Sequence, residues 1–281
     1  MRLKDALTRA VAKLSTANVP SPRLNAETLL MFALGSDRAY LYAHPERTLN
    51  PDDLARYDDA LSQRARGIPA QYITGHQEFW GLDLIVTPAV LIPRPETEHI
   101  IETVLHLVAE ADQRAPKILD VGTGSGCIAL ALAHELGQAE IHACDVSPDA
   151  LEIAQANAAR LELDPRIQFR ESDLLGAYAP SDQFDFIVSN PPYVAERDFD
   201  SIEAQVRRFE PHRAVFGGET GFDVYKRLIP LAREHLQDGG WLVMEVGYGM
   251  EADIQAMLQG WTEIGATADL QGITRVISAR K

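Results

Sequence analysis

The stretch Phe184-Asp-Phe-Ile-Val188, followed by Ser189-Asn190-Pro191-Pro192-Tyr193, decides how this chain folds. An apolar run of this length, bounded by turn-forming residues, is typical of a buried parallel strand. The two consecutive prolines fix φ and remove two backbone donors, so the strand must end at this point. Its last carbonyl oxygens then point into the cleft beyond its carboxyl end.

The Asn190 side chain and the Pro191 carbonyl would be two acceptors held rigidly together. They suit recognition of both hydrogens of a planar –NH2 group, whose flat face Pro192 and Tyr193 can cover. The same residues also fit a plain strand-to-loop turn, because Asn-Pro commonly opens turns. Taken alone, the motif favours neither interpretation.

A second motif lies upstream, where a strand at 117–121 is followed by Gly122-Thr123-Gly124-Ser125-Gly126 and a helix at 127–136. Glycines at such a turn let the backbone approach a ligand and put the helix N-terminus against it. The third glycine comes one residue too early for the dinucleotide fingerprint, which disfavours a nicotinamide site. The next strand, 140–145, ends at Asp145, where a carboxylate can bind both hydroxyls of a ribose.

The remaining strands complete one sheet. We expect them at the ranges 166–170, 184–189, 241–246, 262–268 and 273–279, the last two as an antiparallel pair. Seven strands that alternate with helices predict a doubly wound, Rossmann-like α/β sheet, with ligands at the carboxyl ends of its strands.

The first 75 residues differ from this pattern and predict a small all-α domain. Leu3, Leu7, Val11 and Leu14 recur at helical spacing, and Ser21-Pro22, Asp37 and Asn50-Pro51 each read as a helix start. A β-hairpin that turns near Gly81 follows. We therefore predict a helical domain at 1–75, a hairpin linker at 76–92 and a catalytic domain at 93–281.

Two further segments flank the catalytic motifs: Leu91-Ile-Pro-Arg94-Pro95-Glu96-Thr-Glu98 before them, and Glu210-Pro211 with Phe216-Gly-Gly-Glu-Thr-Gly221 after them. Together, these residues resemble the HemK/PrmC family of S-adenosylmethionine-dependent methyltransferases. Members of that family methylate the glutamine of the Gly-Gly-Gln motif in peptide-chain release factors. The resemblance covers essentially the whole chain, including the helical N-terminal segment.

The resemblance implies a role for each motif. S-adenosylmethionine, with S-adenosylhomocysteine as product, would bind the residues Gly122, Thr123, Gly124, Ser125, Gly126, Asp145, Asp173, Leu174 and Asn190. Asp173 would accept from the adenine amino group and Leu174 would pack on its ring. The catalytic residues would be Asn190, Pro191, Pro192 and Tyr193, which would also bind the substrate.

The resemblance also implies where the release factor binds. The helical domain would grip this protein substrate, while the hairpin and the proline-arginine loop would lie over the active site. Phe79, Arg94 and Pro95 would then contact the substrate, although an aromatic residue in a hairpin is more often structural than functional.

The charge distribution bears on the main alternative, an enzyme that methylates the exocyclic amine of adenine in DNA or RNA. Residues 1–75 carry 10 Lys and Arg against 8 Asp and Glu, a net charge of +2, whereas 76–281 carry 16 against 33, a net charge of −17. A nucleic-acid enzyme needs a basic groove to neutralise phosphates. The acidic catalytic half therefore favours a protein substrate over direct nucleic-acid binding.

Composition bears on where the protein acts and on whether it binds a metal. No apolar run approaches the ~18 residues of a membrane span, and the N-terminus carries no apolar signal region. Cys127 and Cys144 are expected to be reduced, buried residues of a cytoplasmic protein. The histidines are scattered without metal-ligand spacing, so we expect no metal, and we expect a monomer.

Overall fold

The computed structural model describes residues 1–281, which divide into two compact units. The helical unit comprises Met1–His76 together with Glu203–Phe209, and the catalytic unit comprises Gln77–Ile202 and Glu210–Lys281. None of the helices combines the length and apolar character needed to cross a membrane.

The helical unit has its own hydrophobic core. Its helices are α1 Leu3–Thr16, α2 Pro22–Leu34, α3 Arg38–Ala43, α4 Pro51–Ala65 and α5 Ala70–Thr74. Asn50 begins α4, as predicted, by accepting the Asp53 N–H at 2.7 Å, and Gly35 ends α2 in the left-handed conformation. The buried stripe Leu3, Ala6, Ala10 and Leu14 packs α1 against its neighbours.

A short helix from a distant part of the chain, α9 Ala204–Phe209, also belongs to the helical unit. The buried Arg64 guanidinium donates to Gln205 Oε1 at 3.2 Å, and the Phe209 ring lies against Gly67. The predicted catalytic domain at 93–281 included this segment, because a contact with residues 1–75 leaves no sign in the local sequence.

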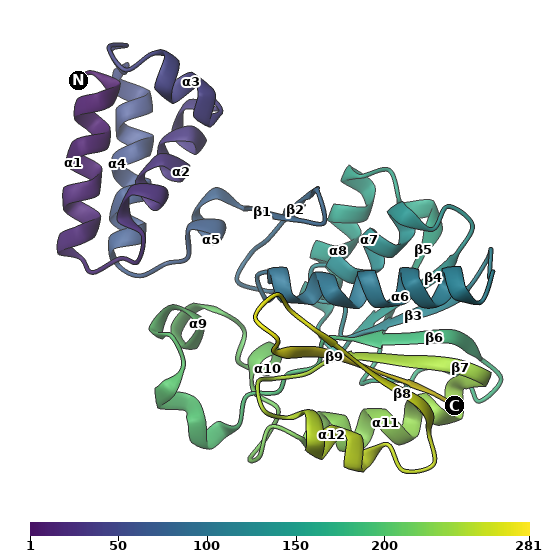
Figure 1. Ribbon diagram of the computed structural model, residues 1–281. Helices are drawn as coiled ribbons and strands as arrows, with labels where there is room; N and C mark the ends of the chain where they lie inside the picture. The colour runs from purple at the N-terminus through teal and green to yellow at the C-terminus, as the bar shows by residue number, and fades with distance from the viewer. The chain divides into compact units, whose positions relative to one another are not determined.

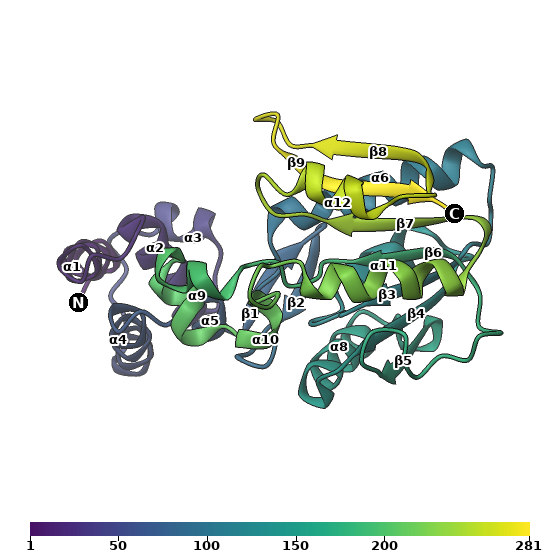
Figure 2. The same cartoon turned by 90° about the horizontal axis from the view of Figure 1, so that it is seen from below.

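The catalytic unit contains a hairpin, β1 His76–Phe79 and β2 Leu82–Ile85, and a seven-stranded sheet. The sheet strands are β3 Lys117–Val121, β4 Glu140–Asp145, β5 Ile167–Glu171, β6 Phe184–Ser189, β7 Leu236–Glu245, β8 Thr262–Ala268 and β9 Thr274–Arg280. Their order is β5-β4-β3-β6-β7-β9-β8, visible from bottom to top in Figure 2, with only the β7–β9 and β8–β9 pairs antiparallel. This confirms the predicted doubly wound fold.

Helices cover both faces of the sheet (Figure 1). The helices of the catalytic unit, not all of which cover the sheet, are η1 Pro95–Thr97, α6 Glu98–Glu110, α7 Cys127–Glu135, α8 Pro148–Arg160, η2 Asp164–Arg166, η3 Glu196–Ser201, α10 His212–Val215, α11 Asp223–His235 and α12 Glu251–Met257. Alternate strand residues point to opposite faces. Ile118 therefore packs into one core with α6 and α7, while Leu119 packs into the other with α11 and α12.

The chain reverses its direction of travel across the sheet between β3 and β6, since β4 and β5 lie on one side and β6 and β7 on the other. Ligands of open α/β sheets bind at such a switch point, beyond the carboxyl ends of the strands. Val121, at the end of β3, pairs with Cys144 of β4 and with Ser189 of β6. The Gly-rich loop, Asp145 and Asn190, which lie at or just after these three strand ends, therefore meet at one edge of the sheet.

One strand differs from its prediction. β7 begins at Leu236, whereas the sequence predicted a strand from Trp241. Phe184 pairs with Leu236 and Phe186 with Trp241, so β7 carries extra residues against β6. Asp238-Gly239-Gly240 therefore forms an irregularity within the ladder, although its composition is typical of a turn.

Candidate active site

The Gly-rich loop closes onto the end of β4. The backbone N–H groups of Gly122 and Thr123 donate to the Cys144 carbonyl at 2.8 and 2.9 Å, and that of Gly124 donates to Asp145 Oδ2 at 2.9 Å. Gly126 has φ +84°, and a Cβ there would meet Ala154 Cβ at 3.2 Å. Another residue at position 126 would thus be strained and would also press on α8.

Asp145 is held by backbone donors on both oxygens, because Oδ1 accepts the Ser147 N–H at 2.9 Å. Burial raises the pKa of Asp145, while these N–H groups act in the opposite direction. Its carboxylate has further lone pairs for hydroxyl groups of a ligand.

A cavity of about 560 Å³ lies between the loop, Asp145 and the end of β6, within the size range of small-molecule sites. Among the predicted site residues it is lined by Gly122, Thr123, Gly124, Ser125, Asp145, Asp173, Leu174, Asn190, Pro191 and Pro192. Gly126, Tyr193, Phe79, Arg94 and Pro95 do not line it. The structure thus gathers motifs from three successive strand–helix units around one cavity.

Two buried polar atoms beside the Gly-rich loop lack a hydrogen-bond partner, Oδ1 of Asp120 and Oγ of Ser125. Burial raises the pKa of Asp120 to about 7, although its Oδ2 accepts from Thr123 Oγ1 at 2.6 Å. Buried polar atoms are normally paired, so Ser125 Oγ, whose residue lines the cavity, could contact a polar group of a ligand, whereas Asp120 does not line the cavity and holds the loop through Thr123. Asp120 was not predicted as a site residue; the available signal was a carboxylate within an apolar strand.

The Asn-Pro-Pro-Tyr segment is fixed at the end of β6. Ser189 Oγ donates to the Val121 carbonyl at 2.7 Å, and Asn190 Nδ2 donates to Thr97 Oγ1 at 3.1 Å. Asn190 Oδ1 and the Pro191 carbonyl receive no hydrogen bond from the protein. Asn190 and Pro191 both line the cavity, and recognition of an –NH2 group by these two acceptors stays a prediction.

Glycines of the later motif allow the backbone to approach this segment. A Cβ at Gly217 would lie 2.3 Å from the Pro192 carbonyl oxygen, and one at Gly221 would lie 2.4 Å from that of Tyr193. Gly217 also donates its N–H to the Val194 carbonyl at 2.9 Å. The Phe216–Gly221 segment thus packs closely against the Asn-Pro-Pro-Tyr backbone, and Phe216 itself lines the cavity.

Tyr193 and Asn190 both connect to a buried acid that the sequence analysis missed. Tyr193 Oη donates to Glu245 Oε1 at 3.2 Å, and Thr97 Oγ1 donates to Glu245 Oε2 at 2.6 Å. Glu245 is 2% exposed, and burial raises its pKa to about 7. In the sequence, the one indication of this role was that Glu245 is a carboxylate at the end of an apolar strand.

Three residues that were predicted to contact the substrate lie outside the cavity lining, each in a different environment. Phe79 is 1% exposed in the core of the catalytic unit. Arg94 pairs with Glu210 at 2.5 Å, and the second Glu210 oxygen accepts the Ile92 N–H at 3.2 Å. Pro95 opens η1 and is exposed. The Arg94–Glu210 pair ties the proline-arginine loop to the segment before α10.

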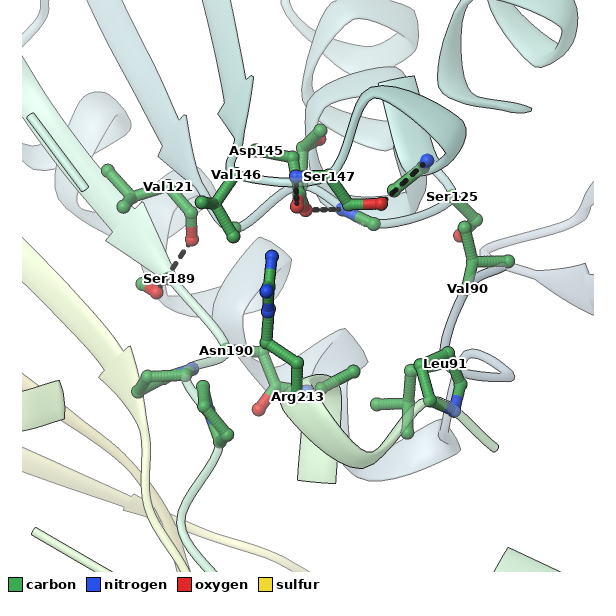
Figure 3. Close-up of a pocket in the computed structure, with 18 of the residues that line it drawn as sticks. Val90, Leu91, Val121, Ser125, Asp145, Val146, Ser147, Ser189, Asn190 and Arg213 are labelled. Atoms are coloured by element: carbon green, nitrogen blue, oxygen red, sulfur yellow. Dashed lines mark hydrogen bonds between the residues drawn. The ribbon is translucent and has the colours of Figure 1, made fainter. Parts of the chain in front are cut away.

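Asp173 and Leu174 line the cavity beside Arg227, which also lines it. Asp173 Oδ2 pairs with Arg227 at 2.7 Å, and Leu174 has φ +51°, an unusual conformation for a leucine. Such backbone strain is concentrated at functional sites. Arg213, which the sequence analysis missed, reaches from α10 into the cavity towards Asp145 (Figure 3).

Comparisons with known proteins fit this geometry. Residues 5–75 match the PrmC N-terminal domain and residues 102–208 match the Methyltransferase small domain. The hMettl16 catalytic domain, solved with a hairpin of the MAT2A 3′UTR, superposes with a TM-score of 0.58 at 20% identity over 79% of this chain and 81% of that one. The T. thermophilus 16S rRNA methyltransferase RsmC, solved with AdoMet and guanosine, gives 0.54 at 19% identity over 73% and 49%. The fold is that of a methyltransferase.

Full-length relatives identify the family. Release factor glutamine methyltransferase of Koribacter versatilis is 56% identical over 281 residues, which cover 100% of this chain and 99% of the relative. That of Geobacter sulfurreducens is 42% identical over 95% and 92%. The chain belongs to the release factor glutamine methyltransferase family, which confirms the resemblance seen in the sequence.

Proposed function

We propose that this protein transfers a methyl group from S-adenosylmethionine to the side-chain amide nitrogen of the glutamine in the Gly-Gly-Gln motif of a peptide-chain release factor. The observation that carries the proposal is the pair of free acceptors, Asn190 Oδ1 and the Pro191 carbonyl, at the edge of a cavity bounded by Asp145. S-adenosylhomocysteine would be the second product.

The cofactor would bind in the cavity at the ends of β3 and β4. Asp145 would accept both ribose hydroxyls, and the Gly-rich loop would let the backbone approach the ligand. Leu174 would pack on the adenine ring, while Asp173 would have to exchange or share its pairing with Arg227 to accept from the adenine amino group. When bound, S-adenosylmethionine supplies an electrophilic methyl group on a sulfonium.

The chain's own residues would overcome the weak nucleophilicity of an amide. Asn190 Oδ1 and the Pro191 carbonyl would each accept one N–H of the glutamine and aim its nitrogen at the methyl carbon. Such alignment and electrostatic stabilisation are the main sources of rate in an in-line transfer. The Tyr193 hydroxyl is bonded to Glu245 and Tyr193 does not line the cavity, so Tyr193 would support the site rather than act as a base. The proton can leave after attack, since an N-methylated amide cation is very acidic.

The same two acceptors would exclude glutamate, whose carboxylate offers no donor to them and repels them. They would not by themselves exclude the amino group of adenine. The net charge of −17 on residues 76–281 disfavours that alternative, because a nucleic-acid substrate needs neutralised phosphates.

We further propose that residues 1–75, which match the PrmC N-terminal domain, bind the release factor, and that 76–92 link them to the methyltransferase domain. All the residues of the proposed site come from one chain, so a monomer suffices. Action on release factors implies a cytoplasmic enzyme.

The direct test is mass spectrometry of the Gly-Gly-Gln peptide after the protein, S-adenosylmethionine with a labelled methyl group and a purified release factor are incubated together. One added methyl on glutamine is expected, and none on a factor in which that glutamine is replaced by glutamate. Label in an adenine-containing RNA or DNA, with an unmodified factor, would reject the proposal.

A further inference from the structure

Two buried side chains, Thr97 and Glu245, lie behind Asn190 and make no contact with the substrate in the mechanism above. Asn190 Nδ2 contacts Thr97 Oγ1 at 3.1 Å, and Thr97 Oγ1 contacts Glu245 Oε2 at 2.6 Å. The other Glu245 oxygen accepts from Tyr193. Thr97 and Glu245 are 1% and 2% exposed, so bulk water does not compete for these bonds.

The direction of these hydrogen bonds follows from the protons available. A threonine hydroxyl has one proton, whereas an ionised carboxylate, the form of Glu245 above its pKa of about 7, has none and can only accept. When Glu245 is ionised, the Thr97 proton must therefore go to it. Thr97 Oγ1 is left with lone pairs alone on its Asn190 side, so Asn190 must turn its –NH2 towards Thr97. The Asn190 carbonyl oxygen then faces the cavity.

The arrangement of Glu245 is specific to this task. Its two carboxylate oxygens are bonded only to Thr97 and Tyr193, whereas the neighbouring Tyr225 hydroxyl donates to the Glu245 backbone carbonyl at 2.7 Å. A buried carboxylate is costly, and an apolar residue in its place is often as stable or more so. The carboxyl group is thus better explained by its hydrogen bonds with Thr97 and Tyr193 than by packing.

We propose that Thr97 and Glu245 are positioning residues that fix the orientation of the Asn190 amide, and that they thereby make the site select a glutamine over a glutamate side chain. The proposal rests on the proposed function. With the Asn190 amide reversed, its –NH2 would face the –NH2 of a substrate glutamine, and two donors cannot pair. The reversed amide would instead donate to a carboxylate.

The test is a double-variant cycle with Thr97 and Asn190. Thr97→Val removes the hydroxyl at nearly constant volume, and Thr97→Ser is the matched control that keeps it. Thr97→Val is expected to lower kcat on the release factor by about 10- to 100-fold, as for the partners that orient metal-ligating side chains. Thr97→Ser is expected to restore most of it, with S-adenosylmethionine affinity unchanged in both.

The decisive measurement is the same substitution in the Asn190→Ala background. If Thr97 acts through Asn190, Thr97→Val should have almost no further effect there, because coupled residues are non-additive. The glutamate form of the factor should also become a better competitive inhibitor of Thr97→Val than of the wild type. Thr97→Ala, which removes the same hydroxyl, replaces Thr97→Val if that variant does not fold.

An equal loss of kcat from Thr97→Val in both backgrounds, or unchanged inhibition by the glutamate form, would overturn the positioning role. Those results would leave the proposed function intact, because they require a wild-type enzyme that methylates glutamine. A wild-type protein that does not methylate the factor would instead reject the proposed function, and with it this inference.

Discussion

Gly124 donates its backbone N–H to Asp145 Oδ2 at 2.9 Å, so the middle of the Gly-rich loop and the acid at the end of β4 form one hydrogen-bonded unit. The same carboxylate holds the start of α8 through the Ser147 N–H. Asp145 therefore shapes the cavity and, in the proposed function, also binds the ribose.

Asp145→Ala should weaken S-adenosylmethionine binding by about 1–3 kcal/mol, because two hydrogen bonds to the ribose and the anchor of Gly124 are lost. Isothermal calorimetry measures this change. Asp149→Ala, which removes an exposed acid in the first turn of α8, is the control and should bind normally. Unchanged affinity in folded Asp145→Ala would show that Asp145 is not the ribose ligand.

Arg94→Ala should destabilise the protein by about 3 kcal/mol, because it leaves the charge of Glu210, whose side chain is fully buried, without its partner. Chemical denaturation measures the free energy of unfolding. The double variant Arg94→Met with Glu210→Gln should recover most of the loss, since the introduced amide is uncharged and its oxygen can still accept the Ile92 N–H. If the single variant is stable but has a raised KM for the release factor, Arg94 is a substrate contact, as the family resemblance implied.

Glu245 makes stability depend on pH. Burial raises its pKa from 4.5 to about 7, with Glu96 acting in the same direction and Thr97, Tyr193 and Arg275 opposing. Between these two pH values the folded state keeps a proton that the unfolded state has lost. Stability therefore falls as pH rises through this window, by about 3 kcal/mol in total for this group.

Glu245→Gln should remove the part of the pH-dependent loss of stability that Glu245 causes between pH 5 and 8. The free energy of unfolding at each pH measures this. Buried Asp120, whose pKa is also raised to about 7, keeps its own share, so the remaining slope should stay negative. Glu152→Gln, at an exposed position of α8, is the control. Parallel curves for wild type and Glu245→Gln would contradict the burial effect.

Local patterns in the sequence were sufficient to predict the fold. Asn50-Pro51, Ser147-Pro148 and Gly35 each mark a helix end that the structure shows, because capping depends on residues a few places apart. The position of α9 could not be predicted in this way. Its contacts join residues 141 positions apart, Arg64 and Gln205, and nothing in either local pattern specifies the pairing.

The same distinction applies to the site. The Gly-rich loop, Asp145 and Asn190 follow strands whose parallel order brings their ends together, so their convergence could be inferred. Thr97 and Glu245 act through side-chain bonds between residues 148 positions apart. A carboxylate at a strand end is visible in the sequence, but its partner depends on how η1 packs against β7.

Removal of residues 1–76 tests the proposed role of the helical unit. The shortened protein should still bind S-adenosylmethionine, because every residue that lines the cavity lies beyond position 76. It should lose most methylation of an intact release factor, because its docking domain is missing, and α9 would also lose its partner Arg64. A short Gly-Gly-Gln peptide, which cannot use the helical domain, should be methylated at similar rates by both proteins. Full activity of the shortened protein on the intact factor would contradict this division of roles.

The sharpest test of the proposed mechanism is Asn190→Ala. It removes the acceptor for one N–H of the bound glutamine and leaves the Gly-rich loop and Asp145 unchanged. Loss of one preorganised polar contact at a reacting centre typically lowers turnover by about 10²- to 10³-fold, so kcat should fall steeply while S-adenosylmethionine affinity changes little.

Asn190→Asp refines the result, because it keeps an acceptor of the same size but cannot donate to Thr97. It should retain more activity than Asn190→Ala and less than the wild type, since the Thr97 proton would then be shared between two carboxylates. Single-turnover rates with saturating cofactor separate these effects from product release. Wild-type turnover in Asn190→Ala would mean that Asn190 only shapes the turn after β6, and the proposed amide recognition would have to be abandoned.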